Sequence, residues 1–279
     1  MKDSVFRDTA EFRRIIYSHY EEAGRVFPWR KNTDPWGVLV SEFMLQQTQT
    51  DRVIPYWERW MRLWPSPRDL ACASLETVMR EWSGLGYNRR ARYIRDCAAA
   101  IIKDHKCQVP ETPEELQTLP GIGPYTAGAI ACFGYNYPAV FIETNIRAAA
   151  LHFFFQDREG VKDREVFPFL EAALDRETPR KWYWALMDYG AALKKLAVNP
   201  NRKSAHYARQ SPFEGSFRRL RGMVIKALAF QGPATAEDLA RRTGIGQEDV
   251  YKAAESLEKD LMVAEKEGVY RIADMGDIE

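Results

Sequence analysis

The segment 119–145, which reads LPGIGPYTAGAIACFGYNYPAVFIETN, constrains the fold more than any other part of the sequence. Two glycines, Gly121 and Gly123, stand in a short turn, and a helical pattern begins at Pro124, where the missing N–H of proline costs little. Glycine permits left-handed backbone and close approach, so both residues can direct N–H groups outward beside a helix N-terminus. The pattern predicts a phosphate-binding hairpin or an ordinary turn between helices, and the turn alone favours the second.

The remainder of the first 210 residues predicts helices and almost no strands. Apolar side chains repeat at helical spacing, and Thr9, Ser74 and Thr112 stand where N-caps are expected. Further helices are expected over 35–45, 48–64, 88–105, 144–155, 164–175 and 179–195. The fold class predicted for this part is therefore all-α.

The C-terminal part has a different pattern. Residues 199–216 are polar and read as a linker or an extended strap. Helices are then expected over 217–230, after Thr235 and over 247–261, and two short strands turn at 266–268. Together these elements predict a winged-helix module over 217–273. Its third helix carries more acidic than basic side chains, which favours a packing or protein-contact role over reading a DNA groove.

Composition excludes several classes of protein. No apolar run approaches the roughly 20 residues that cross a bilayer, and the charged N-terminus lacks the apolar core of a signal peptide. The four cysteines have no CxxC spacing, so neither a metal site nor a disulfide framework is indicated. We expect a cytoplasmic, nucleoid-associated monomer without membrane contact. The formal net charge of +1 does not by itself indicate a polyanionic partner.

Four motifs in order carry a resemblance to a known family. They are Trp29-Arg30, SEFMLQQTQT at 41–50, GLGYNRRAR at 84–92 and LPGIGPYTAGAI at 119–130. From about residue 27 to 192 the chain resembles the helix-hairpin-helix (HhH-GPD, endonuclease III-like) DNA glycosylase superfamily, and most closely the adenine DNA glycosylases of the MutY type. The resemblance implies a six-helix subdomain over 28–134 that contains the hairpin, a second helical subdomain formed by 1–27 and 135–210, and an active cleft between them.

The resemblance also implies a chemistry. Hydrolysis of an N-glycosidic bond needs a proton for the leaving base, a negative charge near the developing oxocarbenium ion and a positioned water. Glu42 matches the family's acid, and its apolar neighbours would raise its pKa so that it holds the proton. Glu143 would be the electrostatic stabiliser or nucleophile, and Tyr125 a positioning group beside the sugar.

Two of these catalytic positions define subclasses. Glu143 stands where the family has aspartate, and the added methylene moves the carboxylate by about 1 Å or more, which can cost a large factor in rate. The alternative for Glu143 is a helix-capping carboxylate before Thr144. Tyr125 stands where bifunctional relatives carry lysine, and a phenol cannot form a Schiff base. We therefore expect a monofunctional enzyme that leaves an abasic site.

Further residues match the family's DNA contacts. The partner implied is double-stranded DNA with a mismatched or damaged base pair, whose target base is flipped into a pocket. Trp29, Arg30 and Leu45 would line the base pocket; Gln47, Thr48, Leu85 and Tyr87 would wedge into the duplex and contact the opposite base; Gly121, Gly123 and Thr126 would grip phosphate, directly or through a monovalent cation.

The chain departs from the family at its C-terminal end. The family usually holds an iron–sulfur cluster on four cysteines there, whereas no cysteine follows Cys132 in this sequence and Lys194 stands at the place of the first ligand. We expect no cluster and no other metal cofactor. The winged-helix module replaces the family's domain for recognising 8-oxoguanine, so the opposite base that is read remains open.

Two alternative functions follow from the same residues. Related enzymes with tyrosine at this position act on thymine or uracil opposite guanine, so a pyrimidine mismatch glycosylase is one alternative. A non-catalytic DNA-binding protein is the other, with Glu143 marking lost activity. Removal of adenine is the favoured reading.

Overall fold

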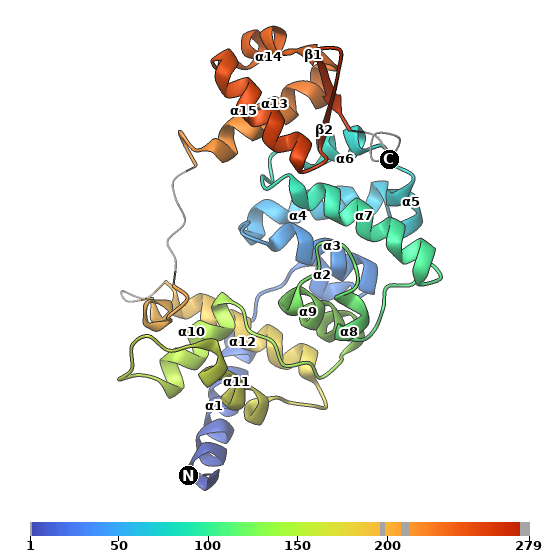
Figure 1. Cartoon of the computed structure of the whole chain (residues 1–279). Coiled ribbons are helices and arrows are strands. Elements are labelled where there is room, and N and C mark those ends of the chain that lie inside the picture. Colours follow the sequence, from blue (N-terminus) through green and yellow to red (C-terminus); the bar gives the residue numbers. More distant parts are fainter. Residues whose placement is uncertain (1, 196–198, 208–212, 274–279) are drawn as a thin grey trace. The chain divides into compact units, whose positions relative to one another are not determined.

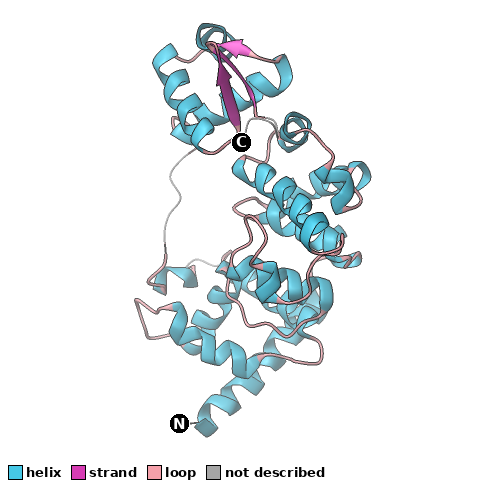
Figure 2. Cartoon of the chain, turned by 45° about the vertical axis from the view of Figure 1, so that its right-hand side comes forward, coloured by secondary structure: helices cyan, strands magenta, loops and turns pink. Residues whose placement is uncertain are grey.

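The computed structural model describes residues 2–195, 199–207 and 213–273, and most of these are helical (Figure 2). The strands of the described part belong to a small sheet near the C-terminus (Figure 2). These features confirm the predicted all-α architecture with a small α+β module. Within the described residues, no helix combines the length and apolar character that crossing a membrane requires.

The chain forms two compact units, each assembled from segments that are distant in sequence. The first unit comprises residues 1–39, 110–118 and 122–209, and the second comprises residues 40–109, 119–121 and 210–279. This division differs from the one expected at 28–134, because residues 28–39 and 122–134 belong to the first unit. The C-terminal module shares the second unit with residues 40–109.

The named elements of the first unit are all helices (Figure 1). Its elements are α1 (Lys2–Ala23), α2 (Pro28–Lys31), the start of α3 (Pro35–Leu45), α8 (Pro113–Leu116), α9 (Pro124–Tyr135), α10 (Thr144–Phe154), α11 (Asp163–Ala173), α12 (Pro179–Leu193) and the 3-10 helix η1 (Pro200–Lys203). Helices α10 and α12 pack closely, because a Cβ atom on Gly190 of α12 would lie only 2.0 Å from the carbonyl oxygen of Asn145. Glycine is therefore required at position 190.

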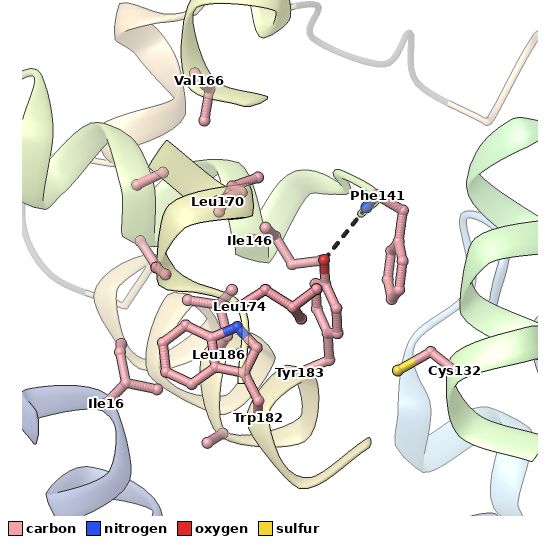
Figure 3. Close-up of a cluster of buried hydrophobic side chains, with 14 of the residues drawn as sticks. Ile16, Cys132, Phe141, Ile146, Val166, Leu170, Leu174, Trp182, Tyr183 and Leu186 are labelled. Carbon is pink, nitrogen blue, oxygen red and sulfur yellow. Dashed lines mark hydrogen bonds between the residues drawn. The ribbon is translucent and has the colours of Figure 1, made fainter. Parts of the chain in front are cut away.

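The core of the first unit is built from aromatic and aliphatic side chains of α1, α9, α10, α11 and α12 (Figure 3). Phe141 stacks on Tyr183 with ring centroids 4.0 Å apart, and the backbone N–H of Phe141 donates to the Tyr183 hydroxyl at 3.3 Å (Figure 3). This bond satisfies a buried phenol that would otherwise be costly to desolvate. Trp182 packs edge-on against Phe12 of α1, which joins the N-terminal helix to this core.

Residues 199–207 form a strap over the first unit. The N–H of Val161 donates to Lys203 and the N–H of Ala205 donates to Val161, both at 2.9 Å, which forms a parallel bridge between residues 161 and 204. Buried Asn201 donates from Nδ2 to the carbonyl oxygen of Thr144 at 2.9 Å. The described part of the predicted linker thus packs against the start of α10, while residues 208–212 of that prediction lie outside the described residues.

The second unit combines helices of residues 40–109 with the C-terminal module. The helices are the end of α3, α4 (Thr50–Leu63), α5 (Pro67–Ala71), α6 (Leu75–Trp82) and α7 (Arg89–Asp104). Trp60 of α4 is buried and meets Trp64 and Trp82 edge-on, with centroids 4.7 and 5.2 Å away. Most of the tryptophans in this region are therefore core residues.

The C-terminal module has the predicted winged-helix order. It contains α13 (Phe217–Gln231), β1 (Ala234–Thr235), α14 (Ala236–Thr243), α15 (Gln247–Lys259), β2 (Val263–Lys266) and β3 (Val269–Ile272). The antiparallel sheet has the order β1-β3-β2, and β2 and β3 turn at Glu267 and Gly268, both with left-handed backbone. The hairpin confirms the predicted wing, whereas the two-residue strand β1 was too short to give an alternating pattern.

Most predicted helix starts agree with the structure. Ser74 accepts a hydrogen bond from Thr77 N at 3.1 Å, and Thr112 accepts one from Glu115 N at 3.3 Å. The expectation for Thr9 was wrong, because α1 begins at residue 2 and Thr9 lies buried inside it. The first two turns of α1 contain few apolar residues, so they show no helical hydrophobic pattern in the sequence.

Candidate active site and DNA-contact loops

Glu143 is the N-cap of α10. Its Oε1 atom accepts hydrogen bonds from the backbone N–H groups of Asn145 at 2.6 Å and Ile146 at 2.8 Å. Its Oε2 atom accepts from the Thr144 hydroxyl at 3.0 Å and from Asn145 Nδ2 at 3.3 Å. The carboxylate is thus held at the positive end of a helix, which stabilises negative charge. Glu143 therefore has the capping role considered for it, and the hydrogen bonds orient its carboxylate.

Lys194 approaches the same carboxylate from the end of α12. Its Nζ atom donates to the Thr144 hydroxyl at 3.1 Å, and that hydroxyl in turn donates to Glu143. Burial lowers the pKa of Lys194, the attraction of Glu143 opposes this change, and repulsion from Arg147 and Arg25 adds to it. Lys194, which stands where the first cluster ligand was expected, therefore supports the start of α10 through its hydrogen bond to Thr144.

Glu42 lies near the end of α3, in the second unit. Its side chain belongs to a residue only 5 % exposed, and its neighbours Phe43 and Met44 are fully buried. The run VLVSEFML consists of buried residues, so the carboxyl of Glu42 is largely shielded from solvent. Burial of a carboxyl costs free energy, and carboxyls are therefore buried mainly where a function requires it.

The hairpin between α8 and α9 requires glycine at only one of its two positions. Gly121 has φ +77°, and a Cβ atom there would lie 2.7 Å from the Tyr93 Cβ atom. Gly123 is the N-cap of α9 with φ −92°, and a Cβ atom there would meet nothing within 4 Å. Both glycines are exposed, as the phosphate-binding prediction needs, but only Gly121 is fixed by conformation and close packing.

Tyr125 and Thr126 occupy the first turn of α9. Tyr125 is half-buried, and its ring lies edge-on to Phe141 with the centroids 5.9 Å apart. Thr126 is buried, so it contributes to the interior of the helix start rather than to an open surface. The Phe141 contact connects Tyr125 to the segment that leads into Glu143, within the first unit.

Arg30 has a structural partner that sequence reasoning did not identify. Its Nη1 and Nη2 atoms bind both carboxylate oxygens of Asp188, each at 2.8 Å, and Arg25 Nε binds the same carboxylate at 2.8 Å. Burial opposes ionisation of Asp188, but the hydrogen bonds and positive charges of Arg30 and Arg25 together outweigh it and hold the pKa of Asp188 below its usual value. Arg30 therefore joins α2 to α12, a role beside the pocket-lining one expected for it.

The other two expected pocket residues differ in their environment. Trp29 is buried in the first unit and stacks on Phe27, with centroids 5.2 Å apart and an angle of 14° between the rings. Leu45, at the end of α3, is half-buried in the second unit. Each remains a candidate for contact with a flipped base.

The expected DNA-probing residues lie on two loops that a single arginine holds. Buried Arg90 donates to the carbonyl oxygens of Gln46 at 2.6 Å, Gly86 at 3.0 Å and Leu85 at 3.3 Å. It also donates to the Thr48 hydroxyl at 3.1 Å. Desolvation lowers the pKa of Arg90 to about 10, which remains high enough to keep it charged at neutral pH. Arg90 belongs to the motif GLGYNRRAR, but the burial of its guanidinium could not be predicted from the sequence.

The two loops contain unusual backbone conformations. Gln47 has φ +55° and is exposed, and Tyr87 has φ +49° and is half-buried. Non-glycine residues adopt this region rarely, and they concentrate at functional sites where surrounding bonds hold them. Leu85, also expected to wedge into the duplex, is buried, with 5 % of its surface exposed.

Comparisons with known proteins agree with this arrangement. The family model for the HhH-GPD superfamily of base excision DNA repair proteins matches residues 40–173. An adenine DNA glycosylase of Mycobacterium tuberculosis is 37% identical over 271 residues, which cover 89% of this chain and 88% of that protein. The human adenine DNA glycosylase is 41% identical over 154 residues, which cover 51% of this chain and 28% of that protein.

Solved structures share the fold. A thermostable thymine-DNA glycosylase has a TM-score of 0.62 at 20% identity and covers 71% of this chain and 92% of that chain. A non-covalent endonuclease III–DNA complex has a TM-score of 0.57 at 20% identity and covers 68% of this chain and 89% of that chain. At this identity the likeness establishes the architecture and nothing about the substrate.

The chain belongs to the HhH-GPD superfamily of base excision DNA repair glycosylases. Within that superfamily it is of the MutY type, the group of the adenine DNA glycosylases. The predicted resemblance is thereby confirmed. The superfamily's iron–sulfur cluster does not fit the residues present: Lys194 takes part in the Thr144 contact, and the cysteines stand at positions 72, 97, 107 and 132. Among the described residues, no three His, Cys, Asp or Glu side chains are grouped closely enough to bind a metal ion.

Proposed function

We propose that this protein is a monofunctional adenine DNA glycosylase, which hydrolyses the N-glycosidic bond of an adenine flipped out of a mispaired duplex and leaves an abasic site. Two ordered carboxyl groups within the family-matched region carry the proposal. Glu42 is 5% exposed and lies in the buried run at the end of α3, and Glu143 is fixed by four hydrogen bonds at the start of α10. The chemistry needs one carboxyl of each kind.

Each group has a distinct role in the proposed reaction. Glu42 donates a proton to the leaving adenine, which makes the base a better leaving group. Glu143 places negative charge beside the sugar as positive charge develops at its anomeric carbon. Tyr125, fixed by its edge-on contact with Phe141, positions the sugar. Since tyrosine has no amine, no Schiff base forms and the DNA strand is not cut by the enzyme.

The partner of this reaction is a DNA duplex that the enzyme opens at a mismatch. Gln47 and Tyr87 present side chains from loops whose backbones Arg90 fixes, which suits residues that must enter a base stack without collapsing. The exposed Gly121–Gly123 turn at the start of α9 offers backbone N–H groups to a phosphate. Nothing in the proposed reaction requires a second copy of the chain, so we propose a monomer.

The test is a single-turnover cleavage panel on labelled duplexes. Adenine is placed opposite guanine and 8-oxoguanine, thymine and uracil are placed opposite guanine, and alkali reveals abasic sites. We expect breaks after alkali treatment only, chiefly at adenine. Breaks at thymine or uracil would indicate a pyrimidine mismatch glycosylase, and tight binding without any product would indicate a non-catalytic DNA-binding protein.

Variants assign the roles. Glu42→Gln should lower adenine release by about 100-fold or more, the usual contribution of a general acid. Glu143→Gln should also abolish most of the rate, because it removes the charge while keeping the size of the side chain. Glu22→Gln, an exposed carboxyl on α1, is the matched control and should leave the rate unchanged. Unchanged adenine release by Glu42→Gln would refute its assignment as the acid.

A further inference from the structure

Tyr87 is held by a residue of the winged-helix module. Arg218, in the first turn of α13, donates from Nη1 to the Tyr87 hydroxyl. Its guanidinium carbon also lies 5.4 Å from the centroid of the Tyr87 ring. The guanidinium of Arg90 lies 5.5 Å from the same centroid. Two arginines, one from each part of the second unit, therefore contact one aromatic side chain.

The two arginines control different parts of Tyr87. Arg90 donates to the carbonyl oxygens of Leu85 and Gly86, so it fixes the backbone that leads into Tyr87. Arg218 bonds to the hydroxyl at the tip of the side chain. The hydroxyl bond is a second restraint on this partly buried side chain, because hydrogen bonds to the backbone do not by themselves fix its χ angles. The direction of the ring thus depends on Arg218 together with the guanidinium of Arg90 that contacts the same ring.

The place of Arg218 is itself fixed, because the module is anchored to residues 40–109. Helix α13 packs on α6, and Arg80 of α6 donates to the carbonyl oxygen of Ala229. Arg92 Nη1 of α7 donates to the carbonyl oxygen of Asp260 at 2.6 Å. The carboxylate of Asp260 pairs with Arg221 of α13. These bonds set the start of α13 beside the loop that carries Tyr87.

The module's third helix is unsuited to DNA. The exposed face of α15 bears Glu248 and Glu255, each paired with the lysine one turn further on. The ion pairs leave this face without the excess positive charge that attracts phosphates. The contact between α13 and Tyr87 is therefore the feature that connects this module to the DNA-probing loops.

We propose that Arg218 is a positioning residue for Tyr87, and that through this contact the winged-helix module sets the enzyme's selectivity for the base opposite the excised one. The proposal rests on the proposed function, in which Tyr87 enters the duplex beside that base. Selectivity follows from ring placement, because a displacement of about 1 Å in a positioned group changes rates by large factors.

The experiment compares adenine excision from duplexes with guanine, 8-oxoguanine or cytosine opposite adenine, under single-turnover conditions. Arg218→Ala should reduce the ratio between the best and worst of these rates by about fivefold, the change expected from losing one hydrogen bond. Arg218→Lys, which keeps a donor, should restore part of it. Arg219→Ala is the matched control, since Arg219 lies on the same helix turn and pairs with Glu214 at 3.3 Å.

A double-variant cycle separates positioning from general loss of charge or folding. Tyr87→Phe removes the hydroxyl that accepts from Arg218 but keeps the ring that its guanidinium contacts, so adding Arg218→Ala should change the ratio less than it does in the wild type. Additive effects, an unchanged ratio in Arg218→Ala, or an equal loss in Arg219→Ala would overturn the proposal. Thermal unfolding of each variant shows whether the fold is intact.

The wild-type rates decide the proposed function separately. Absence of adenine release by the wild-type enzyme would refute adenine glycosylase activity, whatever the variants do. In that event, equilibrium binding of the same duplexes still tests Arg218. A selectivity ratio that falls in Arg218→Ala but not in Arg219→Ala would support the positioning role, and equal ratios would refute it.

Discussion

The hydroxyl of Thr144 is placed to control the geometry of the Glu143 carboxylate. It accepts from Lys194 at 3.1 Å, so its own proton is directed at Glu143 Oε2, 3.0 Å away. Glutamate has one more rotatable bond than the aspartate expected at this position, and each added restraint on its carboxylate therefore matters more. The hydrogen bond from Thr144 to Oε2 thus adds a restraint that compensates for the longer side chain of Glu143.

We predict that Thr144→Val lowers the single-turnover rate of adenine release by about tenfold, as expected for one hydrogen bond to a charged group. Thr144→Ser keeps the hydroxyl and should retain most of the rate. Because Thr144 is exposed, neither change should alter duplex affinity or thermal stability much. Equal rates in the valine and serine variants would show that the hydroxyl plays no part.

The hairpin glycines give a second prediction at this scale. Gly121→Ala should lower the free energy of unfolding by about 1 to 2 kcal/mol through its left-handed backbone alone. The approach of its Cβ atom to Tyr93, at 2.7 Å, adds to this loss. Gly123→Ala has open space and φ −92°, so its effect in urea unfolding should be smaller. A larger effect at position 123 would contradict the assignment.

At the scale of elements, Asp188 connects α12 to α2 and to the segment before it. Its side chain is 1% exposed and its pairing is bidentate with Arg30, so the ion pair is buried and its geometry is good. Breaking one partner of such a pair leaves the other charge buried without compensation. Asp188 therefore holds three segments of the first unit in one arrangement.

We predict that Asp188→Asn lowers the free energy of unfolding by about 3 to 5 kcal/mol at neutral pH. The pKa of Asp188 is lowered in the folded state, so its contribution is present above the unfolded pKa of about 4 and is lost as the pH falls. The wild type should lose stability on acidification, whereas the variant should lose less. Glu11→Gln, which removes an exposed helix pair with Arg14, is the control and should leave the urea midpoint unchanged.

The elements also show what the sequence can and cannot reveal. The caps Ser74 and Thr112 could be predicted from the sequence, because each hydrogen bond joins residues only three positions apart. The partners of Arg30 and Lys194 could not be predicted, since Asp188 and Thr144 lie 158 and 50 residues away. The ordered motifs located Glu42, Glu143 and the probing loops, whereas burial of Arg90 and the Arg218–Tyr87 contact depend on tertiary packing.

At the scale of the whole molecule, polar contacts stabilise the end of the first unit. Lys194 bonds to Thr144, Asn201 bonds to the carbonyl oxygen of the same residue, and residues 203–205 pair with Val161. All of these contacts are made by the protein's own polar groups, and two of them converge on the residue next to Glu143. We propose that this strap takes the structural role of the iron–sulfur cluster that the resemblance implies.

We therefore predict that the purified enzyme contains no stoichiometric iron and keeps its full rate of adenine release after dialysis against a chelator. Metal analysis and visible absorbance measure the first property, and the single-turnover rate before and after dialysis measures the second. Attempted reconstitution with iron and sulfide under reducing conditions is the control, and it should change neither value. Iron bound at cluster stoichiometry, with activity lost on its removal, would show that ligands elsewhere in the chain hold a cluster and that the strap does not replace it.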